Sequence, residues 1–114
     1  MTTVYGIKNC DTVKKALKWL DTHNIAYRFH DFRQDGISKA ELQQWSKAVG
    51  WEALLNRRST TWRQLPEQDK NNVDANKAVL LMLSNPTLIK RPVMTTGKTT
   101  LVGFKEADYK QALN

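Results

Sequence analysis

The stretch of sequence that decides the fold runs from Thr2 to Leu20 and reads TTVYGIKNCDTVKKALKWL. Residues 2–7 are rich in β-branched and aromatic side chains, which predicts a first strand. From Asp11 onward the apolar side chains recur at helical spacing and lysines occupy other positions, which predicts a helix. A strand, a short turn and a helix therefore meet around Cys10.

A second strand follows this helix. Within residues 25–32, Tyr27 and Phe29 alternate with polar neighbours, which is typical of a strand whose two faces differ. Two strands joined by a helix form a βαβ unit, in which the strands are parallel and the crossover is right-handed. The N-terminal third therefore predicts an α/β fold.

The middle of the chain predicts a mostly helical insertion at about residues 38–84. Ser38 and Glu41 have the spacing of a capping box that opens a helix, and Gly50 is placed to end it. Asp74 is placed to cap a further helix in the same way.

The C-terminal part predicts a β-hairpin and a closing helix. Residues 87–94 and 99–102 are the expected strands, and Pro92 must lie at a strand start or a sheet edge because it has no N–H. Residues 104–113 are the expected helix. We expect a single domain, residues 1–114, with the order βαβ, helical insertion, ββα.

The composition excludes several classes of protein. The chain has 114 residues, a net charge of +7 and one cysteine. No run approaches the ~18 apolar residues of a membrane-spanning helix, and residues 1–20 contain lysines where a signal peptide is apolar. One cysteine cannot form an internal disulfide, and with two histidines it offers no metal-ligand spacing. We expect a soluble cytoplasmic protein with no metal and no tightly bound cofactor.

The positive charge is spread evenly along the chain. Residues 1–38, 39–72 and 73–114 carry net charges of +2, +2 and +3, without a basic tail or arm. Such a distribution is typical of a solvated surface and does not favour a nucleic-acid partner.

Cys10 is the strongest candidate for chemistry because it lies at the expected start of a helix. Backbone N–H groups and the positive dipole end of a helix stabilise a thiolate, which is the reactive form. Lys14, one turn later, adds positive charge, and the Thr12 hydroxyl is placed to bond the sulfur or to cap the helix. The alternative is a small buried structural cysteine.

Two arginine-containing segments are candidate anion sites. Arg91 offers a planar fork suited to a carboxylate or an oxyanion, and the Arg91–Pro92 bond is a candidate cis peptide. Arg57, Arg58 and Arg63 are interleaved with hydroxyl side chains that can also bind an anion. The alternative for each segment is an ordinary solvated surface.

Three motifs together resemble the arsenate-reductase-like ArsC/Spx/YffB family, and its YffB branch most closely. They are YGIKNCDT at residues 5–12, LLNRR at residues 54–58 and LIKRPV at residues 88–93. The resemblance covers nearly the whole chain and implies a thioredoxin-like fold with a mixed sheet. It also implies that Cys10 is a nucleophile, with a cis-proline at Pro92 packed close to it and the family's oxyanion-binding arginine at Arg91.

The chain also departs from the arsenate reductases of this family. Those enzymes carry a histidine four residues before the cysteine and an arginine near the C-terminus, where this chain has Gly6 and Gly103. Asn56 occupies the position of their loop arginine, so Arg57 or Arg58 would have to take that role.

The residue three positions after Cys10 limits the mechanism. Redox-switch relatives have a second cysteine there and the reductases a serine, but this chain has Val13. Valine cannot resolve a disulfide, so a C-x-x-C mechanism is excluded. The leading hypothesis is a thiol-dependent reductase that uses glutathione as co-substrate and forms a mixed disulfide on Cys10.

The hypothesis assigns a role to each candidate side chain. The residues expected to stabilise the thiolate or an anionic group are Thr12, Lys14 and Arg91, and those expected to bind the substrate or glutathione are Arg57, Arg58 and Pro92. The expected partners are glutathione or a protein thiol or disulfide, with glutaredoxin as a further candidate. We expect a monomer.

Two alternatives remain open at this point. One is a non-catalytic, Spx-like regulatory protein that binds RNA polymerase. The other is a glutaredoxin-dependent arsenate reductase with an altered anion site.

Overall fold

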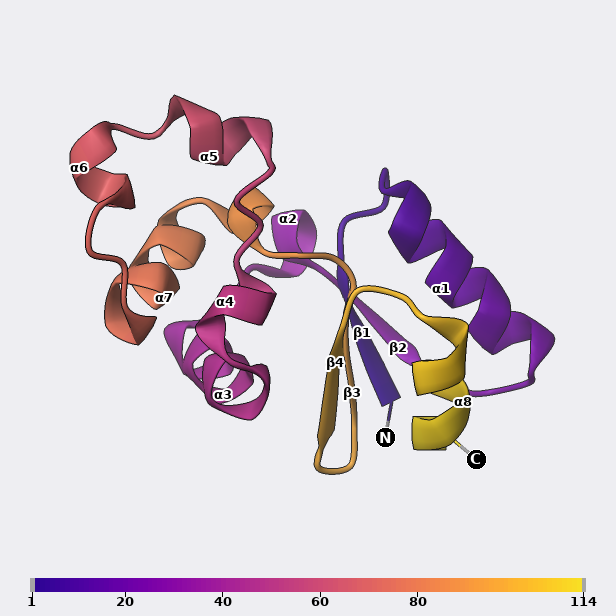
Figure 1. The fold of residues 1–114 in the computed structure, drawn as a ribbon. Coiled ribbons are helices and arrows are strands. Elements are labelled where there is room, and N and C mark those ends of the chain that lie inside the picture. Colours follow the sequence, from indigo (N-terminus) through magenta and orange to yellow (C-terminus); the bar gives the residue numbers. More distant parts are fainter. Residues whose placement is uncertain (1, 114) are drawn as a thin grey trace. The chain divides into compact units, whose positions relative to one another are not determined.

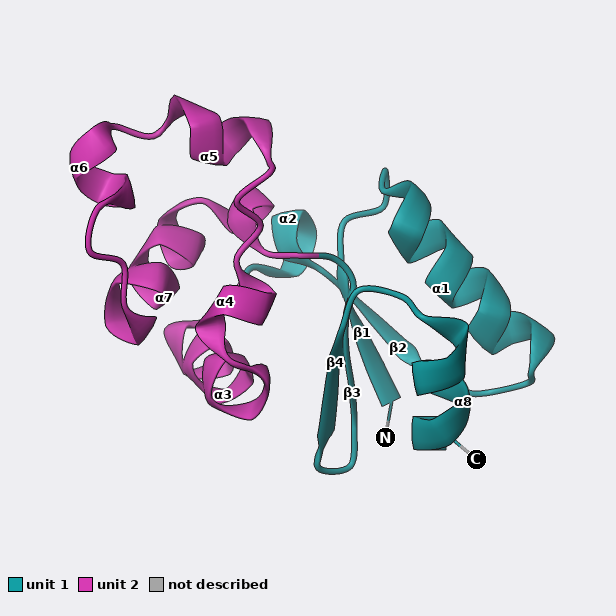
Figure 2. Ribbon diagram, in the orientation of Figure 1, with its two compact units in different colours: residues 1–36, 91–114 teal, residues 37–90 magenta. Residues whose placement is uncertain are grey.

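A sheet unit and a helical unit make up the chain, and Figure 2 colours them separately. The computed structural model describes residues 2–113. The sheet unit consists of the chain up to Gly36 and from Arg91 onward, and the helical unit consists of residues 37–90. None of the described helices is long and apolar enough to cross a membrane.

The sheet unit is built on four strands. These are β1 (Thr2–Gly6), β2 (Arg28–Asp31), β3 (Val93–Thr96) and β4 (Thr99–Val102) (Figure 1). Their order in the sheet is β2-β1-β3-β4. β1 and β2 are parallel, whereas β3 is antiparallel to both β1 and β4. The predicted α/β fold with an initial βαβ unit and a mixed sheet is therefore confirmed.

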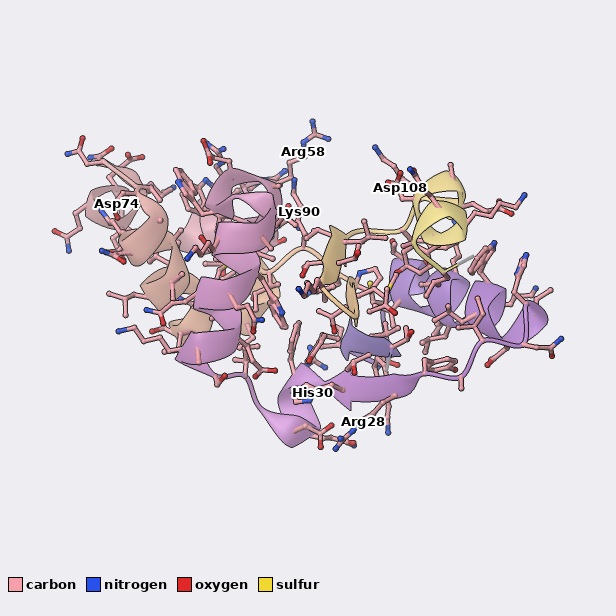
Figure 3. All side chains as sticks on the ribbon, turned by 90° about the horizontal axis from the view of Figure 1, so that it is seen from below. Arg28, His30, Arg58, Asp74, Lys90 and Asp108 are labelled. Carbon is pink, nitrogen blue, oxygen red and sulfur yellow. The ribbon has the colours of Figure 1, made fainter. Side chains whose placement is uncertain are left out.

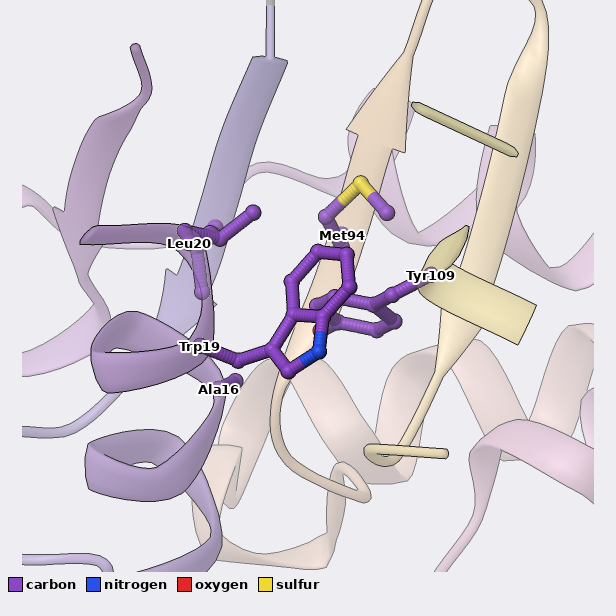
Figure 4. Close-up of a cluster of buried hydrophobic side chains, with 6 residues drawn as sticks. Ala16, Trp19, Leu20, Met94 and Tyr109 are labelled. Carbon is purple, nitrogen blue, oxygen red and sulfur yellow. The ribbon is translucent and has the colours of Figure 1, made fainter. Parts of the chain in front are cut away.

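Two helices cover one face of this sheet. Side chains of α1 (Asp11–Thr22) and α8 (Glu106–Leu113) pack on Val4 and Met94, which are directly opposite each other on β1 and β3 (Figure 4). The buried members of this core are Val4, Ala16, Trp19, Leu20, Met94 and Tyr109. A short helix, α2 (Phe32–Asp35), follows β2.

The turn between β1 and α1 depends on the absence of a side chain at Gly6. A Cβ atom on Gly6 would lie 2.7 Å from Cγ2 of Val13, a distance that real Cβ contacts do not reach. Val13 is fully buried and, as a β-branched residue, has little rotamer freedom in a helix. Gly6 therefore lets the first turn of α1 pack directly on the end of β1.

The helical unit contains α3 (Lys39–Val49), α4 (Trp51–Leu54), α5 (Thr60–Gln64), α6 (Glu67–Lys70), α7 (Ala75–Ser84) and the 3₁₀ turn η1 (Pro86–Leu88). The predicted capping box is present, because Ser38 Oγ accepts from the Glu41 backbone N–H at 3.1 Å and Glu41 Oε1 accepts from the Ser38 N–H at 3.2 Å. Asp74 Oδ1 caps α7 by accepting from the Lys77 N–H at 2.8 Å. Gly50 follows α3 directly, as predicted.

The predicted strand over residues 87–94 is wrong except at its end, because only Val93 and Met94 of this range lie in β3. Pro86 opens the turn η1, and β3 begins only at Val93. The physical reason is Pro92, which has no N–H to donate to a sheet ladder and so confines the strand to the residues after it.

Two other boundaries also differ from the prediction. Half of the polar segment at residues 56–63 is helical, because Ser59 Oγ accepts from the Trp62 N–H at 3.1 Å and caps α5. The second strand covers only the later part of residues 25–32. For α5 this cap sets the boundary, which periodicity alone does not reveal.

The core of the sheet unit yields a stability prediction at Tyr109. Its ring is fully buried, and its hydroxyl has no hydrogen-bond partner among the described residues. Burial also raises the pKa of Tyr109, so the phenol stays protonated. Because an unpaired buried hydroxyl is unfavourable, Tyr109→Phe is expected to leave the free energy of unfolding unchanged or to raise it by up to about 1 kcal/mol.

Urea denaturation measures this effect. Tyr109→Leu is the matched control, since it also removes the hydroxyl but loses the aromatic packing, and it should lower the free energy of unfolding by about 2 kcal/mol or more. A Tyr109→Phe variant that loses as much stability as Tyr109→Leu would contradict the prediction.

Candidate functional site

Cys10 lies at the N-cap of α1, where the sequence places it. Its backbone is extended, with φ −124° and ψ 122°, and its carbonyl accepts the first helical hydrogen bond from the Lys14 N–H at 3.0 Å. The side chain is partly buried and caps no backbone N–H group of the helix. A free thiol therefore sits at the positive end of the α1 dipole.

The two polar neighbours of Cys10 on α1 are exposed. Lys14 and Thr12 both point into solvent from the first two turns. No hydrogen bond joins the Thr12 hydroxyl to the sulfur within the part of the chain that the structure describes. Lys14 thus offers positive charge one turn from the thiol, and the role of Thr12 stays a prediction.

The sheet register brings Arg91 and Pro92 to the same end of the central strands as Cys10. Tyr5 near the end of β1 pairs with Val93 at the start of β3. The end of β1, from which the chain continues to Cys10, therefore lies beside the start of β3, which Arg91 and Pro92 precede. The Arg91–Pro92 peptide bond is cis, as predicted.

A backbone contact on the other side of Pro92 fixes this segment. Gly103 N–H donates to the Pro92 carbonyl at 2.8 Å. Gly103 has a φ of +80°, which is unfavourable for residues with a side chain. An arginine at this position, as in the arsenate reductases, would therefore be strained.

The Arg91 guanidinium has unsatisfied donors. Its Nε and Nη1 atoms are buried, and neither has a hydrogen-bond partner among the described residues. Buried polar atoms nearly always have partners, and a buried charge without one is costly. A guanidinium donates charge-assisted hydrogen bonds to carboxylates and oxyanions. An anionic ligand would remove this cost.

A second cationic site lies in the helical unit. A pocket of about 380 Å³ is lined by Glu52, Leu55, Asn56, Arg57, Arg58 and Lys90. The guanidinium of Arg57 lies 5.7 Å from the centre of the Trp51 ring, a cation–π distance, and the Arg58 N–H donates to Asn56 Oδ1 at 3.1 Å. With one acidic and three basic side chains, the pocket favours an anion.

Lys90 is the member of this pocket that sequence reasoning missed. The Asn56 N–H donates to the Leu88 carbonyl at 2.7 Å, and the Lys90 N–H donates to the Leu54 carbonyl at 2.9 Å. These bonds hold two distant segments side by side and bring Lys90 to the same pocket as Arg58 (Figure 3). The signal was a lysine beside Arg91 within an apolar motif, but its partner segment could not be read from spacing.

The predicted site residues are thus divided between the units. The sheet unit carries Cys10, Thr12, Lys14, Arg91 and Pro92, and the helical unit carries Arg57 and Arg58. Arg63 is not among the residues that line the pocket of Arg57, Arg58 and Lys90. Residues 2–113 contain no group of three or more metal-ligating side chains.

Comparisons with known proteins agree with the motifs. Curated relatives include an uncharacterized protein of Haemophilus influenzae, 54% identical over 98% of both chains. They also include the global transcriptional regulator Spx of Lactiplantibacillus plantarum, 28% identical over 99% of this chain and 86% of the relative.

Solved structures show the same relationship. The YFFB protein is 49% identical over the full length of both chains, with a TM-score of 0.97. An arsenate reductase (ArsC) related protein of Brucella melitensis is 50% identical over 96% of this chain and 92% of that chain, with a TM-score of 0.77. The ArsC family model matches residues 5–112. The chain therefore belongs to the ArsC family.

Proposed function

We propose that this protein is a single-cysteine thiol oxidoreductase that uses glutathione as co-substrate. The observation that carries the proposal is that Nε and Nη1 of Arg91 are buried without a partner among the described residues, beside the end of β1 from which the chain leaves toward Cys10. A nucleophilic sulfur at a helix N-terminus and a pair of free donors are the parts that thiol exchange with an anionic partner needs. Its ArsC family membership supports the same reading.

The reaction proceeds by two exchanges. The Cys10 thiolate attacks one sulfur of a substrate disulfide, so a Cys10 mixed disulfide forms and the other sulfur leaves as a thiolate that takes a proton. A glutathione thiolate then attacks the substrate sulfur, which releases the Cys10 thiolate and leaves the substrate joined to glutathione. Val13 carries no thiol, so the second thiol must come from outside.

The cationic side chains have separate roles in this proposal. Arg91 donates hydrogen bonds to an anionic group, and Pro92 shapes the adjoining backbone. Lys14 adds positive charge near the thiolate. The pocket of Arg57, Arg58 and Lys90 binds a carboxylate of glutathione or of the substrate, for which its charge is suited.

The cysteine is tested by incubating the protein with oxidised glutathione and weighing it by mass spectrometry. The wild type should gain one glutathione, which reduced glutathione should remove again, and Cys10→Ser should gain none. If the wild-type protein never formed the glutathione adduct, the proposal would be wrong. If Cys10→Ser then still retained RNA polymerase in a pull-down, the Spx-like alternative, which the Spx relatives favour, would replace it.

Arg91 provides a test that separates function from folding. Arg91→Met keeps an unbranched side chain but removes the charge, so the adduct with oxidised glutathione should form about tenfold more slowly. Because two unpaired buried donors disappear, the free energy of unfolding should stay the same or rise by up to about 2 kcal/mol.

Stopped-flow rates and urea denaturation check the two halves of this prediction. Arg63→Met is the matched control, because Arg63 is exposed and lies outside the pocket. An Arg91→Met protein that reacts at the wild-type rate would remove Arg91 from the mechanism.

The arsenate-reductase alternative has less support. The reductases' histidine would occupy position 6, where any Cβ meets Val13, and their arginine would occupy position 103, where φ is +80°. Both positions therefore exclude the reductase residues unless the surrounding backbone or side chains change.

The contact at Gly6 can be measured by a double-mutant cycle. Gly6→Ala should lower the free energy of unfolding by about 1–3 kcal/mol because the added methyl overlaps Val13. In a Val13→Ala background the same change should cost about 1 kcal/mol less, since the overlapping atom is gone. Strictly additive effects in urea denaturation would show that this contact does not constrain the turn.

A further inference from the structure

The sheet unit has a surface pocket between α1 and the start of α8 that the proposed reaction does not use. Its volume is about 370 Å³. Trp19 and Phe104 give it a mainly apolar lining, and Lys15 and Lys18 stand at its edge. This combination of an apolar recess and a cationic rim is typical of a binding site.

The floor of the pocket is held in place before any ligand arrives. Trp19 Nε1 donates to Glu106 Oε1 at 3.2 Å, and the His23 ring stacks on the indole at a centroid distance of 4.0 Å. Trp19 and Phe104 both meet the buried Tyr109 ring edge-on, at centroid distances of 5.8 and 4.8 Å (Figure 4 shows Trp19 and Tyr109). A preformed floor lowers the cost of ordering that binding would otherwise carry.

The rim selects for negative charge. Lys15 and Lys18 are exposed, and the two acidic residues of α1, Asp11 and Asp21, do not line the pocket. The carboxylate of Glu106 accepts a hydrogen bond from the indole. A ligand with an apolar group for the recess and carboxylates beside it would match both features.

The place of the pocket on α1 indicates how large the ligand is. From Cys10 to Trp19 the helix rises about 13 Å at 1.5 Å per residue and makes about two and a half turns, so the pocket lies both along and around the helix from Cys10. A tripeptide that reacts at Cys10 has no need of the pocket. A protein partner covers roughly 800 Å² of surface, which is enough to reach from the sulfur to the pocket.

We infer that this pocket docks an acidic segment of a protein whose sulfur exchanges with Cys10, and that an apolar side chain of the segment enters between Trp19 and Phe104. The inference rests on the proposed function for the exchange step, but the docking itself does not. In this proposal α1 has two roles, since its N-cap residue carries the thiol and its later turns bind the partner.

Docking is tested without thiol chemistry on Cys10→Ser. The probe is a short dye-labelled peptide in which one leucine is flanked by glutamates, and binding is followed by fluorescence anisotropy. Lys15→Glu with Lys18→Glu should weaken binding by at least about fivefold, because two attractive charges become repulsive. Thr22→Trp, which fills the pocket from an exposed position, should weaken it similarly.

The matched control is Lys39→Glu with Lys47→Glu, two exposed lysines of the helical unit with the same change in charge. This pair should leave binding within about twofold of the parent. If both double variants lost the same peptide affinity, the effect would be one of net charge alone, and the docking site would be overturned. A peptide with alanine in place of leucine that binds as well, or hexanoate that binds at least as tightly, would also overturn it.

The exchange step is tested on the protein with Cys10 intact. The same peptide, joined through a glycine linker to a cysteine activated with 2-thiopyridine, should react with Cys10 faster than activated glutathione does. The Cys10 thiolate attacks the peptide sulfur and 2-thiopyridone leaves, so its absorbance reports the rate. Lys15→Glu with Lys18→Glu should abolish the advantage of the peptide and lower the peptide rate much more than the glutathione rate.

The two arms distinguish failure of the docking site from failure of the proposed function. Peptide binding to Cys10→Ser without any reaction at Cys10 would support the docking site and overturn the exchange. Reaction of Cys10 with activated glutathione, combined with no peptide binding, would overturn the docking site and leave the proposed function standing.

Discussion

The contact between Val13 and the backbone at Gly6 is the constraint on which the rest of the sheet unit depends. Because Gly6 has no side chain, the first turn of α1 packs directly on the end of β1, and Val13 is fully buried there. That packing fixes the strand-to-helix turn and places Cys10 at the N-cap. Val13 carries no thiol, so in the proposed exchange the second thiol must come from another molecule.

The antiparallel pairing of β1 with β3 completes the site at the cost of an unpaired charge. Tyr5 pairs with Val93, and the residue pair Arg91–Pro92 therefore precedes β3 at the edge where β1 ends. The fold could bury an apolar side chain in place of Arg91 without leaving donors unsatisfied. Two buried donors without partners are unfavourable for stability, which is why we interpret Arg91 as a binding residue rather than a structural one.

Much of the sheet unit could be predicted from the sequence because its signals are local. The period change at Asp11 located Cys10 at a helix start, and the proline in its motif predicted the cis bond at Pro92. Lys90 could not be placed, because only backbone bonds between residues 54–56 and 88–90 bring it to the Arg58 pocket. The recess beside Trp19 was equally hidden, since that tryptophan was predicted as a core residue and is one, with only its edge contributing to a pocket.

The positively charged side chains differ in burial, and their spacing in the sequence does not reveal which of them are buried. Arg91 has buried donors, so its attraction for an anion is short-ranged and little affected by salt. Lys14 and Lys18 are exposed, so they act over roughly the 8 Å Debye length of physiological solution, steer an approaching partner and lose effect at high salt. Even spacing along the chain thus conceals two different electrostatic environments, the buried donors of Arg91 and the exposed charges of α1, to which the proposals assign different roles.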